Sequence, residues 1–362
     1  MNIKNSTIDE FIKNNANKRI ICFGAGKLFK DMFITMEPTF LKCISCVIDS
    51  NINNQEIRIL DYKINIIAFS DIKKINIQNS VFLITSMYCY NIYKMLSVMY
   101  ENIDIDCYIY TLMSMTTSKS KIIKKYNEDS IPKIIHYCWF GGNEMPYKNK
   151  KCIESWKEKC PDYKIIRWDE SNYDVSKNEY MNNAYKNKKW GFVPDFARLD
   201  IIYNFGGIYL DTDVEMIKPP SELLKYDGFM GFQRNFWIAL GLGFGAKKNN
   251  SLIRQLRDEY FNIKFIDENG NMNMTAAPYY QTSFLKSKLL KCNNELQYIE
   301  NNIILPTDYL DPQGYKYGNT KITENTISIH HYDESWVESK KSNYEKYNEV
   351  NKIIDFVNGM IK

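Results

Sequence analysis

Two aspartates separated by one residue, Asp211 and Asp213, are the residues of this chain best suited to chemistry on a charged substrate. They follow the apolar run Ile208-Tyr209-Leu210, which predicts a short buried strand. Side chains two apart in a strand project to the same side, and α/β folds bind ligands at the carboxyl ends of strands. Two carboxylates at such a place repel each other unless a cation lies beside them, and hard divalent ions take oxygen ligands from carboxylates and phosphates together. The pair therefore predicts a metal ion that bridges the protein to a diphosphate and stabilises charge on a leaving group.

A charged pair precedes these aspartates, on a helix that the sequence delimits at both ends. Pro194 suits the first position of a helix, where its missing N–H costs nothing, and Gly206-Gly207 suits the end. Asp195 and Arg198 lie three residues apart, so they share one face of this helix. Another face is apolar and predicts packing against the core, with Phe196, Leu199, Ile202 and Tyr203. An isolated Asp-x-Asp is more often a solvated turn, but the helix, the two glycines and the strand before it favour a functional site.

Three segments, in this order along the chain, resemble a known family. The window from Asp195 to Asp213 resembles the donor-binding signature of the DXD-containing sugar transferases of glycosyltransferase family 32, and it is similar to the glucosyltransferase domain of the large clostridial cytotoxins. The opening strand from Ile131 to Gly142 and the closing motif from Ile329 to Trp336 carry the same resemblance. The resemblance implies a GT-A fold, in which a Rossmann-like nucleotide-binding half and an acceptor-binding half share one mixed sheet.

The resemblance also implies roles for single residues. Asp213 is expected to bind the metal directly, and Asp211 to contact it through water and hold the ribose. Asp195 and Arg198 are expected to grip the donor sugar and the diphosphate, which suits the forked contacts that arginine makes with phosphate. Trp139 is expected to stack on the base. The expected cofactor is Mn²⁺ or Mg²⁺, and the expected donor is a UDP-linked sugar.

The closing motif holds two of the three histidines of the chain. One of His330 and His331 is expected to contact the metal or the diphosphate, and His331 is the preferred of the two. Ser335 and Trp336 are expected to contribute to the donor site, with Trp336 on a segment that closes over the donor. His136 lies inside an apolar strand, and we interpret it as a core residue.

Two segments downstream of the aspartates bear on the substrates. Gly241 to Lys247 resembles the glycine-rich strand and turn of the family, which predicts a close approach of the backbone to donor or acceptor. Thr275 to Pro278 matches the usual Gly-Pro turn only loosely, which leaves the acceptor side open. The family is associated with retention of the anomeric configuration. Because the sequence offers no obvious enzymic nucleophile, we expect departure and attack on one face of the sugar.

The N-terminal part, residues 1–118, predicts a small Rossmann-like β/α module outside the matched region. Apolar runs typical of buried parallel strands occur at Ile20–Phe23, Cys43–Ile48, Val81–Thr85 and Cys107–Tyr110. Gly24 and Gly26 resemble the first half of a dinucleotide fingerprint, and Asp49 ends the next predicted strand. However, Phe29 stands where the third glycine should be. Docking, self-association or nucleotide-sugar binding are therefore the favoured uses of the module.

Length and composition fit this division. A chain of 362 residues exceeds what one core usually supports. We assign residues 119–130 to a basic linker, 131–340 to the GT-A domain and 341–362 to a C-terminal helix. The 47 basic and 43 acidic side chains give a net charge of +4, too balanced for a nucleic-acid binder. No segment approaches the roughly 18 apolar residues of a membrane span, so we expect a cytoplasmic protein, with attachment to the inner face of the membrane left open.

The expected activity follows from these elements. We expect a metal-dependent, retaining hexosyltransferase that moves a sugar from a nucleotide-diphosphate donor to a glycan or lipid-linked glycan acceptor in bacterial capsular or lipopolysaccharide-type synthesis. A toxin-like protein glycosyltransferase is the nearest alternative, but this chain shows no delivery segments. The sequence also leaves open an NAD-dependent oxidoreductase acting through Gly24 and Gly26, and a sugar-binding module without activity.

Overall fold

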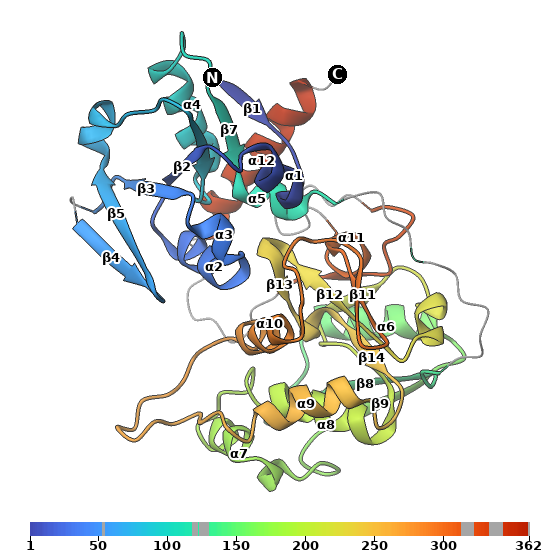
Figure 1. Ribbon diagram of the computed structural model, residues 1–362. Helices are drawn as coiled ribbons and strands as arrows, with labels where there is room; N and C mark the ends of the chain where they lie inside the picture. Colours follow the sequence, from blue (N-terminus) through green and yellow to red (C-terminus); the bar gives the residue numbers. More distant parts are fainter. Residues whose placement is uncertain (53–54, 118–121, 123–129, 313–321, 333–342, 361–362) are drawn as a thin grey trace.

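The computed structural model describes residues 1–52, 55–117, 122, 130–312, 322–332 and 343–360. The chain forms two large sheets, one from the N-terminal part and one from the region that follows it (Figure 1). The α/β class expected from the sequence is confirmed. Within the described residues, no helix has the length and apolar character that a membrane crossing requires.

The first sheet has seven strands and is mainly parallel, with β4 antiparallel to β5. Its strand order is β1 (Asn2–Lys4), β7 (Asp106–Ile109), β6 (Ser80–Ile84), β2 (Arg19–Phe23), β3 (Ile44–Asp49), β5 (Tyr62–Ala68) and β4 (Gln55–Ile59). The four apolar runs predicted as strands are β2, β3, β6 and β7, and they are almost entirely buried. Its helices include α1 (Ile8–Asn14), α2 (Lys27–Thr35), α3 (Pro38–Leu41), α4 (Cys89–Met99) and α5 (Tyr110–Met115). The small Rossmann-like module is therefore confirmed as a fold.

The second sheet is mixed and has eight strands. Its order is β15 (Gln297–Ile299), β16 (Asn302–Leu305), β12 (Gly228–Gln233), β14 (Phe244–Ala246), β10 (Gly207–Tyr209), β8 (Ile134–Cys138) and β9 (Lys164–Trp168), with β13 (Trp237–Ile238) paired to β12. Strands β8, β9 and β10 run parallel, whereas β14 runs antiparallel to both β10 and β12. This is the mixed sheet that a GT-A fold requires.

Helices cover this second sheet, and two short strands form a separate ribbon. The helices are α6 (Tyr147–Lys159), α7 (Glu179–Lys186), α8 (Pro194–Phe205), α9 (Ser251–Glu259), α10 (Ala277–Ser287) and α11 (Thr307–Leu310). The ribbon pairs β11 (Val214–Met216) with β17 (Ser328–His330) in antiparallel register. The last helix, α12 (Asn343–Met360), returns to the N-terminal module and packs beside α4 (Figure 1).

Helix α8 begins and ends where the sequence predicts. Pro194 occupies the first turn, and Gly206 follows the last residue with a φ of 68°. The expectation of one apolar face is too narrow, because every residue from Asp195 to Ile202 is buried. The polar side chains of this helix have hydrogen-bond partners inside the protein. Asp200, for example, accepts a hydrogen bond from the Tyr173 hydroxyl at 2.8 Å. Helix α8 is thus a central helix, and its charged residues are held in the interior.

Buried apolar side chains of the N-terminal module and of the second region pack against one another. One continuous cluster of buried apolar side chains includes Phe29 and Tyr110 of the N-terminal module together with Phe236 and Leu285 of the second region. The proposed linker, residues 119–130, lies outside the described residues except for Ile122 and Ser130. The domain boundaries at 118 and 131 therefore stay a proposal.

Candidate active site

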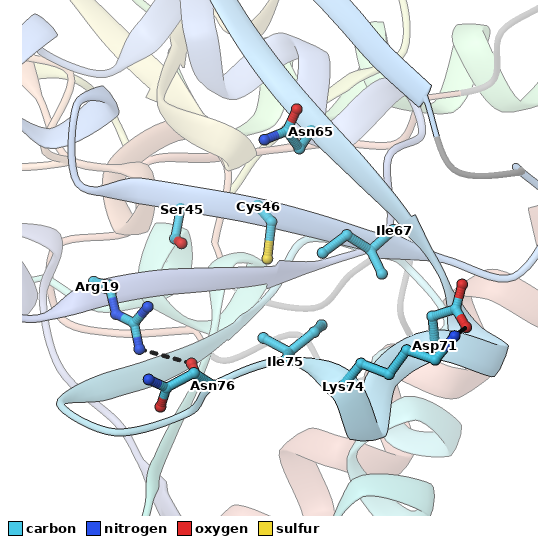
Figure 2. A pocket seen from close by; sticks show the side chains of 9 residues that line it. All are labelled: Arg19, Ser45, Cys46, Asn65, Ile67, Asp71, Lys74, Ile75 and Asn76. Atoms are coloured by element: carbon cyan, nitrogen blue, oxygen red, sulfur yellow. Dashed lines mark hydrogen bonds and ion pairs between the residues drawn. The ribbon is translucent and has the colours of Figure 1, made fainter.

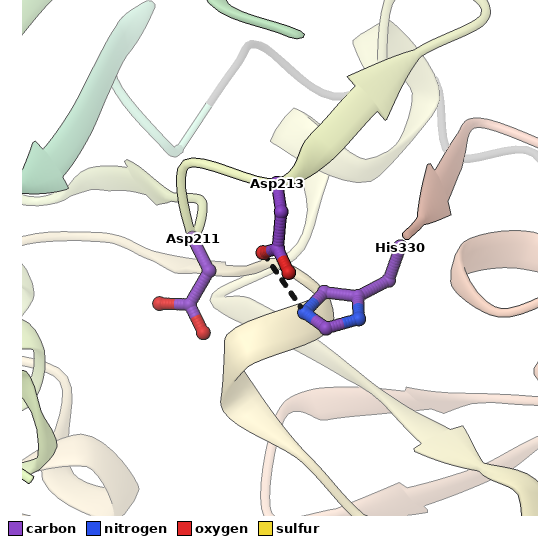
Figure 3. Close-up of side chains that lie close together, drawn as sticks. All are labelled: Asp211, Asp213 and His330. Carbon is purple, nitrogen blue, oxygen red and sulfur yellow. Dashed lines mark ion pairs between the residues drawn. The ribbon is translucent and has the colours of Figure 1, made fainter. Parts of the chain in front are cut away.

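Asp211, Asp213 and His330 converge at the end of β10 (Figure 3). One ligand atom of each lies within 4.8 Å of the others, and this is the group of metal-binding side chains found among the described residues. His330 Nε2 lies 3.2 Å from Asp213 Oδ1. Two carboxylates and an imidazole, partly open to solvent, form a donor set that fits a divalent ion such as Mn²⁺.

A turn, rather than a strand, brings the two aspartates together. Strand β10 ends at Tyr209, and the amide of Val214 donates to the carbonyl of Asp211 at 3.1 Å. The expectation that strand alternation aligns the carboxylates is therefore corrected: the chain reverses between them. The turn is fixed from outside, because Asn149 Nδ2 donates to Thr212 Oγ1 at 2.9 Å inside the protein.

The structure places His330, and not the preferred His331, beside the aspartates. In the β11–β17 ribbon His330 is opposite Val214, the residue after Asp213. The neighbouring His331 directs its ring elsewhere, with Nε2 2.9 Å from Glu215 Oε2, while its backbone amide donates to the Asp213 carbonyl at 2.9 Å. Burial lowers the pKa of His330, but the carboxylates of Asp213 and Asp211 outweigh this and raise it above its ordinary value.

Arg198 connects the predicted helix pair to the aspartates. Its Nη2 lies 2.9 Å from Asp195 Oδ1, and its Nη1 lies 3.5 Å from Asp211 Oδ2. The side chains of Arg198 and Asp195 are only 6% and 5% exposed, whereas that of Asp211 is 29% exposed. Arg198 also lies over the Tyr209 ring, 5.2 Å from its centroid. A fixed guanidinium therefore points from the interior towards the open carboxylate.

Burial changes the protonation of these acids. Loss of solvent raises the pKa of Asp195 from 3.8 to about 7, although the Arg198 charge opposes the change. Burial likewise raises the pKa of Asp211, again opposed by Arg198. The Tyr180 hydroxyl lies 3.4 Å from Asp195 Oδ2, a contact that the sequence alone did not indicate. A positive charge in addition to Arg198, such as a divalent ion, would favour the ionised forms of Asp195 and Asp211.

The glycine-rich segment approaches the carboxylates themselves. The amide of Asp211 donates to the carbonyl of Gly241 at 3.3 Å. A side chain at position 241 would collide with Asp211 Oδ2 and would come within 3.3 Å of Arg198 Nη1. In the structure this backbone lies against Asp211, and its predicted close approach to donor or acceptor stays a prediction. A Cβ at this position would therefore force the Asp211 carboxylate to move away from its present place.

His136 is a core residue, as interpreted from the sequence. Its side chain is completely buried, Trp168 Nε1 donates to its Nδ1 at 3.0 Å, and its Nε2 lies 2.9 Å from the Gly206 carbonyl. Because Nδ1 accepts, the neutral ring carries its proton on Nε2 and donates it to Gly206. Burial lowers the pKa of His136 to about 4. The residue thus ties β8 and β9 to the glycine turn that precedes Asp211.

Trp139 lies at the same edge of the sheet as the aspartates. Strands β8 and β10 are parallel neighbours, with His136 opposite Tyr209, so the residues that follow each strand emerge side by side. The Trp139 ring is half-buried, and its Nε1 donates to the Asn143 carbonyl at 2.7 Å. Stacking of this ring on a base stays a prediction. The predicted donor contacts Ser335 and Trp336 lie outside the described residues.

The glycine turn of the N-terminal module differs from a dinucleotide site. The amide of Ala25 donates to Asp49 Oδ2 at 2.8 Å, and that of Asn51 donates to Asp49 Oδ1 at 2.9 Å. Both oxygens that would hold a ribose are therefore engaged by backbone. Phe29, at the position of the third glycine, is completely buried in the helix–sheet interface. These contacts weigh against an oxidoreductase that acts through this turn.

A shallow recess lies elsewhere on the same module (Figure 2). It is lined by Arg19, Ser45, Cys46, Asn65, Ile67, Asp71, Lys74, Ile75 and Asn76. Its two cations are engaged by neighbours: Arg19 donates to the Asn76 carbonyl at 2.7 Å, and Lys74 pairs with Asp71 at 2.6 Å. The recess therefore offers little free charge to a phosphorylated ligand.

A family model described as "Glycosyltransferase sugar-binding region containing DXD motif" matches residues 146–230. This range contains α6, α8, β10 and both aspartates of the candidate site. The chain thus carries a DXD-containing glycosyltransferase region, as the resemblance of its motifs implied.

Curated proteins and a solved structure are also similar to this chain. It is 33% identical over 160 residues to mannosyl phosphorylinositol ceramide synthase of Saccharomyces cerevisiae, covering 39% of each protein. It is 34% identical over 150 residues to inositol phosphoceramide mannosyltransferase 3 of Schizosaccharomyces pombe, covering 38% of this chain and 40% of that protein. It therefore spans about two fifths of the length of these relatives. Among solved structures, PaToxG glycosyltransferase is similar at 18% identity and a TM-score of 0.36, covering 44% of this chain and 70% of that one.

Proposed function

We propose that this protein is a metal-dependent glycosyltransferase that transfers a sugar from a nucleoside diphosphate donor. The observation that carries the proposal is the convergence of Asp211, Asp213 and His330 within 4.8 Å of one another, where two of the three belong to the matched DXD region. Like charges this close are costly unless a cation shares the site, and a diphosphate supplies the remaining oxygen ligands. The bound ion would supply stabilisation of the negative charge on the leaving diphosphate.

The protein side chains would divide the remaining work. Asp213 and Asp211 hold the ion, with His330 as a further ligand or as a donor that orients Asp213. Arg198 is held by Asp195 and aimed at Asp211, so its guanidinium is pre-organised for the donor and needs no reorganisation during the reaction. Asp195 keeps Arg198 in place, and burial raises the pKa of this acid to about 7.

The names of the relatives bear on sugar and acceptor. By name, one yeast protein is a mannosyl phosphorylinositol ceramide synthase and the other is an inositol phosphoceramide mannosyltransferase. These names favour a hexosyl donor and a phosphorylated lipid or glycan acceptor over a capsular chain. We keep a UDP-sugar as the first donor to test and a GDP-sugar as the second. Retention through attack on one face of the sugar belongs to the same proposal, and a trapped covalent glycosyl-enzyme would contradict it.

The decisive experiment is a panel of UDP- and GDP-sugars assayed with Mn²⁺, with Mg²⁺ and with chelator. We expect one donor to raise the thermal midpoint and to be hydrolysed slowly only when a divalent ion is present. Asp213→Asn removes one carboxylate charge from the site and should abolish this metal-dependent binding while the thermal midpoint of the free protein stays close to that of the wild type. Asp162→Asn, at an exposed ion pair with Lys133, is the matched control and should behave as the wild type. Equal donor binding by Asp213→Asn and the wild type would remove the basis of the proposal.

A further inference from the structure

A single segment, Arg234 to Gly241, borders the candidate site at both of its ends. At the second end, the Gly241 carbonyl accepts from the Asp211 amide, and the Gly241 Cα leaves no room for a side chain beside Asp211. Any displacement of this segment would therefore move Asp211 or crowd it.

The first end of the segment reaches the site through an aromatic ring. Arg234 donates from its amide and from Nε to Asp311 Oδ2, at 3.1 and 3.2 Å. The Tyr332 hydroxyl donates to the same oxygen at 2.7 Å, and the Arg234 guanidinium lies 4.7 Å from the centroid of the Tyr332 ring. The Tyr332 ring in turn packs edge-on against His330, with 4.2 Å between the centroids. The position of Arg234 is thus transmitted to His330 by direct packing.

The backbone between these ends is strained. Asn235 and Phe236 are consecutive residues with φ values of 67° and 66°, in the left-handed region that disfavours side chains other than glycine. Such conformations persist only where the surroundings over-determine them, and they occur often at functional sites. The conformation of this turn therefore depends on what packs around it.

The N-terminal module supplies one part of that packing. The Phe236 ring is completely buried and meets Tyr110 edge-on, with 5.4 Å between the centroids. Tyr110 is the first residue of α5, directly after β7, and its hydroxyl shares a hydrogen bond of 3.0 Å with Thr35 Oγ1 at the end of α2. The strained turn is thus held by a tyrosine that the module fixes at two points.

Helix α10 holds the other part of the segment. The amide of Ile238 donates to Thr282 Oγ1 at 2.9 Å, and the amide of Leu240 donates to Gln281 Oε1 at 3.0 Å. Both side chains are buried, so the two amides have no access to water as an alternative partner.

The same helix is fastened to the module about one turn further along. Lys286 Nζ donates to the carbonyls of Ile34 and Met36, at 2.7 and 3.2 Å, where α2 ends. A cation at this end of a helix satisfies carbonyls that lack helical partners. Helix α10 contacts both α2 of the module and β13 of the second sheet (Figure 1). The module therefore contacts the segment twice, directly through Tyr110 and indirectly through α10.

We infer that the N-terminal module is a positioning element of the transferase site: Tyr110 and the Lys286-bearing face of α10 hold residues 234–241 so that Asp211 and His330 keep their places. The inference rests on the proposed function for its catalytic readout. It assigns Tyr110, Phe236, Gln281 and Lys286 as positioning residues that act on the site through residues 234–241.

The first test is Lys286→Met in the full chain, because methionine keeps most of the unbranched apolar stem of lysine and removes the ammonium group that contacts the α2 carbonyls. We expect kcat/KM for the donor to fall about 10-fold, the size typical of outer-shell changes at metal sites, with a nearly unchanged thermal midpoint. Lys286→Arg should restore most of the activity. Lys288→Met is the matched control, since the contact of Lys288 is with Phe284 on its own helix, and it should leave kcat/KM unchanged.

Tyr110→Leu tests the direct contact. Shifts of about 1 Å in catalytic groups can cost about 100-fold in rate, and we expect a loss approaching this size in kcat/KM. Phe82→Leu is the control, because Phe82 is equally buried but belongs to the apolar cluster on the opposite face of the module's sheet. This control should lower the thermal midpoint and leave kcat/KM of the folded protein unchanged.

Amide hydrogen exchange separates this inference from the proposed function. The amides of Ile238 and Leu240 should exchange at least 10-fold faster in Lys286→Met and Tyr110→Leu than in the two controls, whether or not a donor has been found. Unchanged exchange of both amides, together with unchanged kcat/KM, would overturn the inference. A wild-type protein that processes no donor, but whose variants show the faster exchange, would overturn the proposed function and leave the positioning role in place.

Discussion

Two strand ends in this molecule place acidic side chains in the position where α/β folds bind ligands, and they differ in what the carboxylates do there. In the N-terminal module, Asp49 ends β3 and both of its oxygens accept from backbone amides of the adjoining turns. In the second region, Asp211 and Asp213 follow β10 and lie close to each other and to His330, and Asp211 also lies near the buried Arg198. The oxygens of the first carboxylate accept hydrogen bonds from its own backbone, whereas the second pair would gain stability from a bound cation.

This difference teaches that the position of an acid in the topology does not by itself make a ligand site. A carboxylate whose lone pairs are used by backbone N–H groups stabilises a turn. A carboxylate crowded by another carboxylate, with room left for solvent, stores repulsion that a metal ion and a phosphate can relieve. Substitutions in the two regions should therefore differ in what they change, activity in the second region and stability in the module.

Glycine to alanine should give the largest contrast. Gly241→Ala places a methyl group against Asp211 Oδ2, and we expect kcat/KM for the donor to fall about 100-fold or more, as the shifted carboxylate loses its geometry. Gly26→Ala in the module meets no atom within 4 Å and has a φ of −73°, so it should leave activity and stability nearly unchanged. Steady-state kinetics with Mn²⁺ and a thermal scan of both variants measure this. Similar losses in both would show that the contrast between the regions is wrong.

Acid should weaken the second region through His136. The pKa of this buried histidine is lowered from 6.5 to about 4, so between these values the unfolded chain binds a proton that the folded chain does not. Stability should therefore be lost as the pH falls from about 6.5 to about 4, by up to about 3 kcal/mol. Urea unfolding at several pH values measures the loss. His136→Gln should be less stable at neutral pH but should show a flatter pH dependence, and parallel curves for the two proteins would contradict this role.

Asp49→Asn should have the smallest effect of these substitutions, and it should change the thermal stability but not the activity. The substitution replaces one accepting oxygen by an amide group, so one of the two backbone contacts is lost at a cost of about 1 kcal/mol. We expect a thermal midpoint lower by a few degrees, an unchanged kcat/KM for the donor, and no shift on addition of NAD or NADP. A stabilising shift with either dinucleotide in the wild type, lost in the variant, would instead make the module a nucleotide site.

Local signals in the sequence are sufficient to predict the helix and the strand that precede the aspartates. Pro194 and Gly206 delimit α8, and the apolar run after them is β10. These signals are short-range, since they depend on the φ angles and hydrogen bonds of a few neighbouring residues. The same holds for the four parallel strands of the module, whose continuous apolar runs follow from burial on both faces.

The features that could not be predicted depend on pairing between segments far apart in the sequence. Adjacent residues in a strand face opposite sides, so the choice between His330 and His331 depends on the register of β17 against β11, which neither segment specifies alone. Strands β4 and β5 were not predicted because their residues are largely half-buried or exposed and lack a continuous apolar run. The contacts of Arg234 with Asp311 and Tyr332 link residues far apart in the sequence, and only the fold brings them together.

The shared apolar cluster has a consequence for how this molecule comes apart. Phe29 and Tyr110 belong to the same buried apolar cluster as Phe236 and Leu285, so the unfolding of either sheet would expose apolar side chains of the other. A destabilising substitution in the small module is therefore expected to lower the thermal midpoint of the whole chain. The two sheets are expected to unfold in one cooperative transition.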